Sequence, residues 1–448
     1  MALLTGFMAA LAAHPELELH SLVVLRDGAV AAEQVWAPYL PGDKALVYSV
    51  SKTFTATAIG LAVGEGVLAL DDRVVDLLGV RDVDERVAAL TVHHLLSMST
   101  GHTADTLASL EDLPPERWVE AFLALRPQDP VGSRHVYNNG ASFLLGELVR
   151  RRTGQDLLEY LRPRLLEPLG IDATWDTDAL GRCLGWTGLH LDIGGLAAMG
   201  ELLRCDGVWQ GRRLLPEGWV ARATSRQIPT QPDEPAGREW TLGYGYQVWM
   251  GREGFRLDGA YGQFAFVLPE RGMVVAVQSA QSCTQVLVDL VWGHLLDAGA
   301  PAPEPRPASL PLPADSGVGT RWTAPGPVPL DAGLAEPGED LGLRPDVAEA
   351  SAERDGDSLR LRLVAEGEPV ELVATPGEWR RQVADLGGAP VPVAVAAGAD
   401  DAGALHVRLV FTDTPHTLRL RLGADGSSGL AWKVNPLQGP SLAAMRAH

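Results

Sequence analysis

A serine and a lysine three residues apart, Ser49 and Lys52, stand where the sequence enters a long apolar run. If the run from Phe54 to Leu70 is helical, the two side chains lie on one face, about one turn apart. A serine hydroxyl is a poor nucleophile near neutral pH and needs a neighbouring base. A lysine amine becomes that base when burial or the positive field of a helix N-terminus lowers its pKa. The spacing therefore predicts a nucleophile and its base.

The scarcity of lysine adds weight to this pair. Of the 37 lysine and arginine residues, only Lys44, Lys52 and Lys433 are lysines. Arginine does not release its proton, so a base with an adjustable pKa has to be lysine. An ordinary helix N-cap serine beside a chance lysine gives the same pattern, and Ser-x-x-Lys alone is a weak motif. Taken alone, the pair leaves both interpretations open.

The elements that must position this pair show strand and helix patterns in turn. A hairpin is predicted first, with strands over 21–26 and 29–36 joined by an Asp-Gly turn. Helical periodicity follows, and strand patterns return later. The predicted helices cover 54–70, 91–97, 114–125, 141–152, 156–166, 196–203 and 284–296, and the later strands cover 244–250 and 263–277. Strands that open and close a unit around a helical middle indicate the α+β class.

A proline-rich segment over residues 299–315 separates this part from one with a different pattern. Beyond it, short runs alternate between apolar and polar residues, with turns between them. These runs are Ser358–Val364, Val370–Val373, Leu405–Phe411 and Thr417–Leu422. They predict a small antiparallel β domain, either a lipocalin-like barrel or a sandwich. The predicted domains therefore cover 1–298 and 316–448, with the linker over 299–315.

The composition limits the cellular compartment and the binding partners that we expect for this protein. A net charge of −20 disfavours nucleic acid and anionic membranes. Three widely separated cysteines, Cys183, Cys205 and Cys283, predict reduced, buried thiols in a cytoplasmic protein. The apolar N-terminus lacks the positive start of a signal peptide and fits an amphipathic helix, and no run predicts a transmembrane span. We expect no metal, no cofactor and a small-molecule or peptide substrate; the oligomeric state stays open.

Eight short stretches follow one another in the order of a known superfamily, between residues 17 and 297. They are Ser49-Val-Ser-Lys52, Leu68–Val74, Leu90–Gly101, Tyr137-Asn-Asn139, Phe143–Glu147, Glu167–Ile171, Gly207–Leu215 and Gly262–Val267. In this order they resemble the serine β-lactamases and penicillin-binding proteins, and most closely the class C β-lactamase-like esterases and peptidases. The resemblance implies an antiparallel sheet flanked by helices, with a helical subdomain.

The resemblance also implies acyl transfer through an acyl-serine. Ser49 would be the nucleophile and Lys52 its base, although the group that takes the serine proton is disputed in such enzymes. Tyr137 would pass protons between Ser49, Lys52 and the leaving group, and an adjacent ammonium would help this tyrosine to ionise. Asn139 would bridge Lys52 and the substrate. By itself, Tyr-Asn-Asn is a plain turn and helix cap.

After the Ser-x-x-Lys and Tyr-x-Asn motifs, the superfamily has a third motif of Lys or His, a small residue and Gly on the strand that lines the site. This sequence departs from that third motif. Here Asp258-Gly259-Ala260 or, one residue earlier, Leu-Asp-Gly takes that place. Gly259 and Ala260 permit a close approach of the backbone. The oxyanion hole would pair the Ser49 N–H with the N–H of Tyr261 or Ala260.

The acid in this element has two interpretations. If Asp258 faces the site, it would repel a substrate carboxylate and raise the pKa of Lys52. Alternatively, Asp258 pairs with Arg256 or Arg252 and lines nothing. His102 is a further candidate, either at the mouth of the pocket or in a capping or packing role.

These observations together predict a metal-free serine hydrolase. An esterase acting on a neutral substrate is favoured over a β-lactamase, because the cation that receives a substrate carboxylate is missing. An acyltransferase or peptide cyclase, as in some relatives that pair this domain with a small barrel-like one, would use the same acyl-enzyme with an amine acceptor. A binding protein without turnover is the alternative outside enzymes.

Overall fold

The computed structural model describes residues 2–231, 237–296, 308–335 and 342–447. The contacts within the chain divide it into two compact units. Unit 1 comprises Met1–Ser21, Gln34–Ala45 and Gln278–Ala447, and unit 2 comprises Leu22–Glu33 and Leu46–Val277. The predicted site residues all belong to unit 2.

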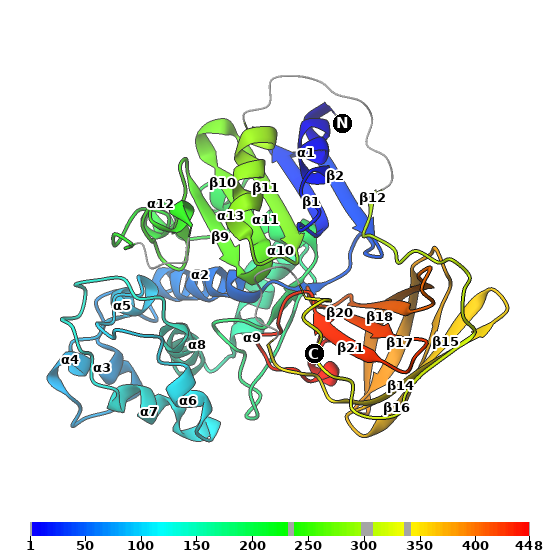
Figure 1. The fold of residues 1–448 in the computed structure, drawn as a ribbon. Coiled ribbons are helices and arrows are strands. Elements are labelled where there is room, and N and C mark those ends of the chain that lie inside the picture. Colours follow the sequence, from blue (N-terminus) through cyan, green and yellow to red (C-terminus); the bar gives the residue numbers. More distant parts are fainter. Residues whose placement is uncertain (1, 232–236, 297–307, 336–341, 448) are drawn as a thin grey trace. The chain divides into compact units, whose positions relative to one another are not determined.

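The largest sheet has seven strands in the order β12-β2-β1-β11-β10-β9-β8 (Figure 1). The strands are β1 (Leu19–Arg26), β2 (Ala29–Ala37), β8 (Trp249–Met250), β9 (Phe255–Gly259), β10 (Gln263–Leu268), β11 (Met273–Ser279) and β12 (Ala308–Ser309). The predicted hairpin is confirmed, and Asp27 and Gly28 have the positive φ values, 49° and 79°, that a two-residue turn of type I′ requires. The strand predicted over 263–277 is two strands, because a turn at Pro269–Arg271 interrupts it.

The helix after Ser49 is α2 (Ser51–Gly64), which is buried from its first residue to Ala62. It ends six residues before the predicted Leu70. Close packing explains a glycine within it, because a Cβ on Gly60 would lie 2.2 Å from the Trp219 ring. Such contact over its whole circumference makes α2 a rigid support for the residues at its start.

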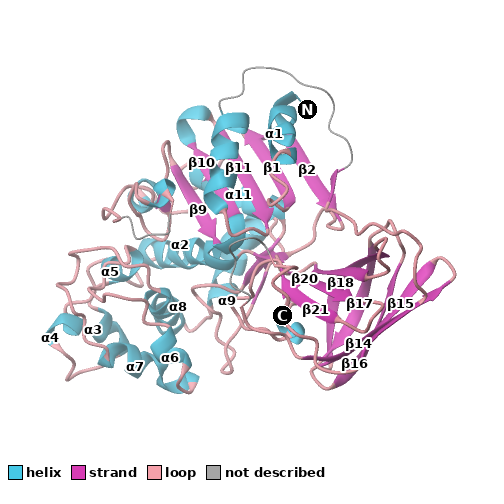
Figure 2. Cartoon of the chain, viewed as in Figure 1, coloured by secondary structure: helices cyan, strands magenta, loops and turns pink. Residues whose placement is uncertain are grey.

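Both units contain further helices (Figure 2). In unit 2 these are α3 (Val74–Leu78), α4 (Glu85–Ala88), α5 (Val92–Leu96), α6 (Ala108–Glu111), α7 (Trp118–Ala124), α8 (Asn139–Thr153), α9 (Leu157–Leu161), α10 (Glu167–Leu169), α11 (Ile193–Arg204) and α12 (Trp219–Ala223). Here α8 packs on α2, and α11 covers β10. Unit 1 holds α1 (Ala2–Ala12) and α13 (Thr284–Leu290). This mixture of helices and antiparallel strands confirms the α+β prediction.

The C-terminal part of unit 1 consists of two antiparallel sheets with the strand orders β13-β14-β15-β16 and β17-β18-β19-β20-β21. The strands are β13 (Arg321–Ala324), β14 (Val347–Asp355), β15 (Ser358–Ala365), β16 (Glu368–Ala374), β17 (Arg380–Leu386), β18 (Ala389–Ala399), β19 (Leu405–Phe411), β20 (Thr417–Leu422) and β21 (Ser428–Trp432). Both sheets contribute to one apolar core. The pairing of these described strands gives two sheets and no closed barrel.

The structure also bears on the predictions for the linker, the cysteines and membrane-spanning segments. Residues 299–307 of the predicted linker lie outside the described residues, whereas Ala308–Ser309 pairs with β2. All three cysteines are free, but Cys283 is exposed and the other two are half-buried, so their predicted burial was wrong. Within the described ranges, no helix is both long and apolar enough to cross a membrane.

Candidate active site

Ser49 lies in a single 3-10 turn, Tyr48–Val50, that leads directly into α2. Tyr48 has a φ of 46°, a left-handed conformation that is uncommon outside glycine and often marks functional sites. Hydrogen bonds fix the turn, because the Ser51 hydroxyl donates to the Tyr48 carbonyl at 2.6 Å and accepts from the Leu189 N–H at 3.1 Å. Ser49 itself is partly exposed. A rigid turn therefore presents its hydroxyl at the start of a helix.

Lys52 is 1% exposed, and its Nζ donates to Ser49 Oγ at 2.8 Å and to the Trp186 carbonyl at 2.7 Å. Burial lowers the Lys52 pKa to about 7, while the carboxylates of Asp105 and Asp258 act in the opposite direction. At neutral pH a large fraction of this side chain is therefore a free amine. At the same 2.8 Å, a free amine can accept the Ser49 proton.

Tyr137 completes the group around the serine. Its hydroxyl hydrogen-bonds with Ser49, and Lys52 Nζ lies 4.8 Å from the centre of its ring. Burial raises the Tyr137 pKa, two nearby carboxylates add to the rise, and the bond to Ser49 opposes it. The expectation that Lys52 helps this tyrosine to ionise is therefore wrong, because burial outweighs any such help. Tyr137 is a phenol that holds its proton and can donate it.

Asn139 is the first residue of α8, and it donates hydrogen bonds to an acid that the sequence did not indicate. The Asn139 backbone N–H and side-chain Nδ2 donate to the two Asp105 oxygens at 2.8 and 2.6 Å. Asn138, not Asn139, caps the helix, because its side chain accepts from the Ala141 N–H at 3.2 Å. In the described part of the chain, no hydrogen bond joins Asn139 to Lys52.

Asp258, on β9, is paired and also acts on the site. Its carboxylate accepts from Arg256 Nε and from the Trp240 indole N–H, both at 2.9 Å, and Arg256 Nη2 lies 2.8 Å away. It also interacts electrostatically with Lys52. Burial raises the Asp258 pKa, and Arg256 counters that rise. Each interpretation therefore holds in part: Asp258 pairs with Arg256, and it also raises the Lys52 pKa.

The end of β9 approaches the turn that carries the serine. A Cβ on Gly259 would lie 2.2 Å from the Val47 carbonyl oxygen, so only glycine fits there. Ala260–Gly262 form a tight turn in which Tyr261 has a φ of 63°. Leu257 is fully buried in the main core. The burial of Leu257 fits the register that begins at Asp258, whereas the need for glycine at 259 fits the one that begins at Leu257, so both registers stay open.

The family model described as Beta-lactamase matches residues 9–297, which is well over half of the chain. The chain belongs to this family. The resemblance drawn from the ordered motifs is thereby confirmed.

Three relatives illustrate this membership. Penicillin-binding protein 4 of Amycolatopsis lactamdurans is 29% identical over 60% of this chain and 79% of its own length. The 6-aminohexanoate-dimer hydrolase of Paenarthrobacter ureafaciens is 27% identical over 45% of this chain, which spans 55% of that relative. The octameric penicillin-binding protein homologue from Pyrococcus abyssi covers 91% of this chain and 97% of its own, with a TM-score of 0.52 and 19% identity. This last likeness shows the fold.

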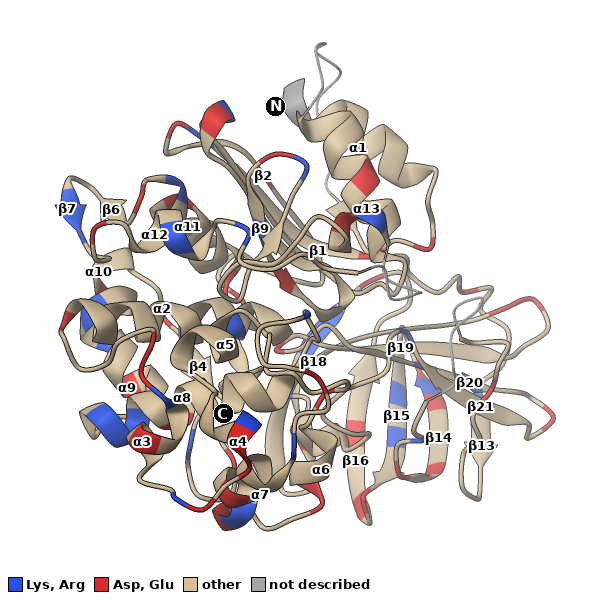
Figure 3. Cartoon of the chain, turned by 90° about the vertical axis from the view of Figure 1, so that its left-hand side faces the viewer, with Lys and Arg blue, Asp and Glu red and all other residues tan. Residues whose placement is uncertain are grey.

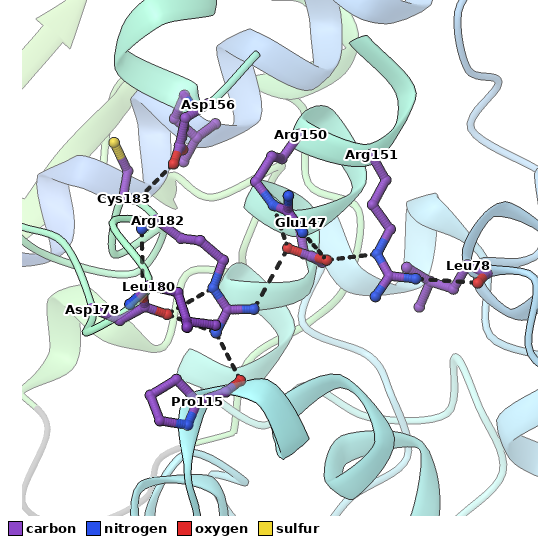
Figure 4. A network of polar contacts seen from close by, with 11 residues as sticks. Leu78, Pro115, Glu147, Arg150, Arg151, Asp156, Asp178, Leu180, Arg182 and Cys183 are labelled. Atoms are coloured by element: carbon purple, nitrogen blue, oxygen red, sulfur yellow. Dashed lines mark hydrogen bonds and ion pairs between the residues drawn. The ribbon is translucent and has the colours of Figure 1, made fainter. Parts of the chain in front are cut away.

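The loop that contains Arg182 and Trp186 is anchored by a buried glutamate, Glu147 (Figure 4). Glu147 of α8 accepts hydrogen bonds from Arg150 at 2.8 Å and from Arg151 at 2.5 Å. Arg182 joins them, with Nη1 3.7 Å from Glu147 and Nη2 2.6 Å from Asp178. Three guanidinium groups and two carboxylates thus tie α8 to the loop that contains Arg182.

This loop delivers a backbone carbonyl to the base. Thr55 of α2 donates to the Gly185 carbonyl at 2.8 Å, and Lys52 Nζ donates to the next carbonyl, that of Trp186. The Trp186 ring packs in the core with Trp118, with centroids 5.9 Å apart. Sequence reasoning missed this contact with Lys52, because every residue type offers the same carbonyl and no signal marks the one that is used.

Two buried histidines, His102 and His190, have hydrogen-bond partners other than the serine, lysine and tyrosine of the site. His102 is 3% exposed, with its ring nitrogens 2.9 Å from the Thr100 hydroxyl and 3.0 Å from the Leu125 carbonyl. Burial lowers its pKa. His190 is also buried, and its Nε2 lies 3.1 Å from Asp176. The structure therefore brings Ser49, Lys52, Tyr137 and the end of β9 together, and places His102 in packing.

Proposed function

We propose that this protein is a serine hydrolase that cleaves an ester or amide through an acyl-Ser49 intermediate. The observation that carries the proposal is the 2.8 Å contact between Ser49 Oγ and the buried Nζ of Lys52, whose pKa lies near neutrality. The free amine accepts the hydroxyl proton as Oγ attacks the substrate carbonyl. Tyr137, which keeps its proton and hydrogen-bonds with Ser49, then protonates the leaving group. Water hydrolyses the acyl-enzyme by the reverse sequence.

The developing oxyanion needs hydrogen-bond donors, and the backbone supplies candidates. The Ser49 N–H at the start of the helix and the N–H of Tyr261 or Ala260 are proposed as the pair. Support comes from the end of β9, where the glycine at 259 lets the strand come within contact of the turn that carries Ser49. Removing one such donor typically costs about 10²–10³-fold in kcat.

The proposed substrate has no carboxylate beside the reacting carbonyl. In neither register does a lysine or histidine take the place of the family's cation, and Arg256 is already paired with Asp258. An ester is favoured, and an amide stays within the proposal because a relative is named for the hydrolysis of a 6-aminohexanoate dimer. An amine acceptor in place of water would make the enzyme an acyltransferase, and product analysis with added amines separates the two outcomes.

A fluorophosphonate probe tests the acyl-serine proposal. We expect one adduct, mapped to Ser49 by mass spectrometry, and loss of both labelling and ester hydrolysis in Ser49→Ala. Ser225→Ala is the control at an exposed hydroxyl outside the serine turn, with labelling of Ser49 expected to persist. If no adduct forms on Ser49 and Ser49→Ala hydrolyses esters like the wild type, the proposal fails and the binding-protein alternative gains support.

A further inference from the structure

Asp105 is a carboxylate at the candidate site that the acyl-transfer chemistry does not use. It is exposed, yet three N–H groups hold it in place: those of Asn139 at 2.8 and 2.6 Å, and that of Leu107 at 3.1 Å. It is close enough to Lys52 and Tyr137 to influence the pKa of each. Across the residues that the structure describes, no arginine, lysine or histidine forms an ion pair with it. The acid is therefore oriented, accessible and uncompensated.

The surroundings of Asp105 make this negative charge stand out. Asp258, the other nearby acid, has Arg256 as its counter-ion. One acidic residue, Glu111, lies on α6, which follows Asp105 in the chain (Figure 3), and its pKa is raised by burial and then by Asp105. Because Lys52 is partly a free amine at neutral pH, it does not balance Asp105 fully. The site thus has an excess of negative charge.

Aromatic rings pack beside Tyr137. The Tyr137 ring stacks on Trp249, with centroids 5.9 Å apart and an angle of 14° between the rings. Tyr244 packs edge-on against Trp249 at 4.9 Å. Aromatic faces attract cations, and an exposed carboxylate repels anions. The exposed carboxylate of Asp105 therefore favours a substrate group of positive charge.

We propose that Asp105 receives an ammonium group of the substrate, so that the preferred ester or amide carries a protonated amine on the side of Asn139. This proposal rests on the proposed function, because it assigns the specificity of the same acyl-Ser49 site. Oδ1 accepts from the N–H groups of Asn139 and Leu107, whereas Oδ2 accepts only from Asn139 Nδ2, so Oδ2 keeps a lone pair for a charged donor. The direct contact between Asp105 and Asn139 would place the substrate amine and the reacting carbonyl within one binding region. No bond to Asp105 forms or breaks in the reaction.

The test compares matched 4-nitroanilides whose acyl chains end in an ammonium or in a methyl group, over a series of chain lengths. In the wild type, at least one ammonium substrate should exceed its uncharged analogue in kcat/KM by about 10- to 100-fold, as a charge-assisted hydrogen bond allows. Asp105→Asn should reduce this ratio to near one. Because Asp105→Asn keeps one acceptor oxygen for the N–H groups, the ratio can be read whatever happens to the absolute rate.

Asp112→Asn is the matched control, since it removes the same charge from the same exposed segment without a bond to Asn139. It should leave the ratio of the wild type unchanged. Added salt provides a second measurement, because screening should lower the ratio in the wild type and leave that of Asp105→Asn unaffected. Both results together support an ion pair between substrate and Asp105.

Three outcomes overturn the inference while the proposed function stands. The first is Ser49-dependent turnover with no preference for the ammonium substrates at any chain length, and the second is a preference that persists in Asp105→Asn. The third is a change in Asp105→Asn that appears only in the pH profile and affects charged and uncharged substrates alike, which would limit Asp105 to an effect on Lys52. Absence of any Ser49-dependent turnover or labelling is instead the failure of the proposed function.

Discussion

Charged side chains of the C-terminal sheets lie in solvent, whereas an arginine beside the candidate site is buried. In β15, arginines alternate with leucines, so that Arg360 and Arg362 are exposed while the leucines fill the core. In β9, Arg256 is 1% exposed and lies against Asp258 and the Trp240 ring. Burying a charge is costly unless it is paired and hydrogen-bonded. A buried charge therefore points to a role that apolar packing cannot fill. Charged residues that alternate with apolar ones along a strand show only which face of the sheet is exposed to solvent.

Loss of the buried lysine should have the largest effect. We expect Lys52→Ala to lower kcat/KM on a neutral activated ester by about 10³-fold or more, because Ser49 loses its general base. Lys44→Ala, at a lysine outside the site, serves as the control and should stay close to the wild type. Steady-state kinetics provide the measurement, and retention of wild-type kcat/KM in Lys52→Ala would show that the base is misassigned.

The two arginines test the comparison through stability. Arg256→Gln should lower the free energy of unfolding by about 3–5 kcal/mol, because Asp258 would remain buried without its cation. Arg360, in contrast, pairs with Asp355 at the surface, where its side chain is 68% exposed. Arg360→Gln should change stability by about 0.5 kcal/mol or less. Similar losses in denaturant unfolding of the two variants would remove the distinction between the regions.

A glycine at the end of β9 tests how closely this strand must approach the serine turn. Gly259→Ala should cost about 1–3 kcal/mol of stability, because its Cβ would clash with the Val47 carbonyl. It should also lower activity by displacing β9 from Ser49. Gly293→Ala is the control, since no atom lies within 4 Å of its added Cβ. Unchanged melting and kinetics in Gly259→Ala would mean that this close approach is unnecessary.

The substitution Asp258→Asn should have the smallest effect on activity, as a shift in the pH profile of kcat/KM. Its carboxylate raises the Lys52 pKa against the stronger effect of burial. In Asp258→Asn the Lys52 pKa should therefore fall, and the acidic limb of kcat/KM should move to lower pH. Asp355→Asn, in β14, should leave that limb in place. A shift to higher pH in Asp258→Asn would contradict the sign of this interaction.

The sequence predicted best what depends on local periodicity. The bounds of β19 and β20 agree with the runs 405–411 and 417–422, because alternation along a half-exposed strand is visible in the residues themselves. The hairpin at Asp27-Gly28 follows from turn chemistry in the same way. The pairing of Ser49 with Lys52 is local too, since both lie within one turn of chain.

The sequence did not predict contacts made across the fold. Asp105 lies 34 residues before its partner Asn139, and the Trp186 carbonyl lies 134 residues after Lys52. The raised pKa of Tyr137 depends on burial by several elements, so the local argument from the neighbouring ammonium gave the opposite sign. The exposure of Cys283 likewise depends on tertiary packing and not on its residue type.

The most direct test of the account is the pH dependence of kcat/KM for a neutral activated ester. The lone pair of Lys52 is available only above its pKa, so activity should be lost as the pH falls through an apparent pKa of about 7. Lys52→Ala should lack this limb. A limb near the ordinary lysine pKa of about 10.4, or a rate independent of pH across the neutral range, would contradict the claim that burial makes Lys52 the base for Ser49.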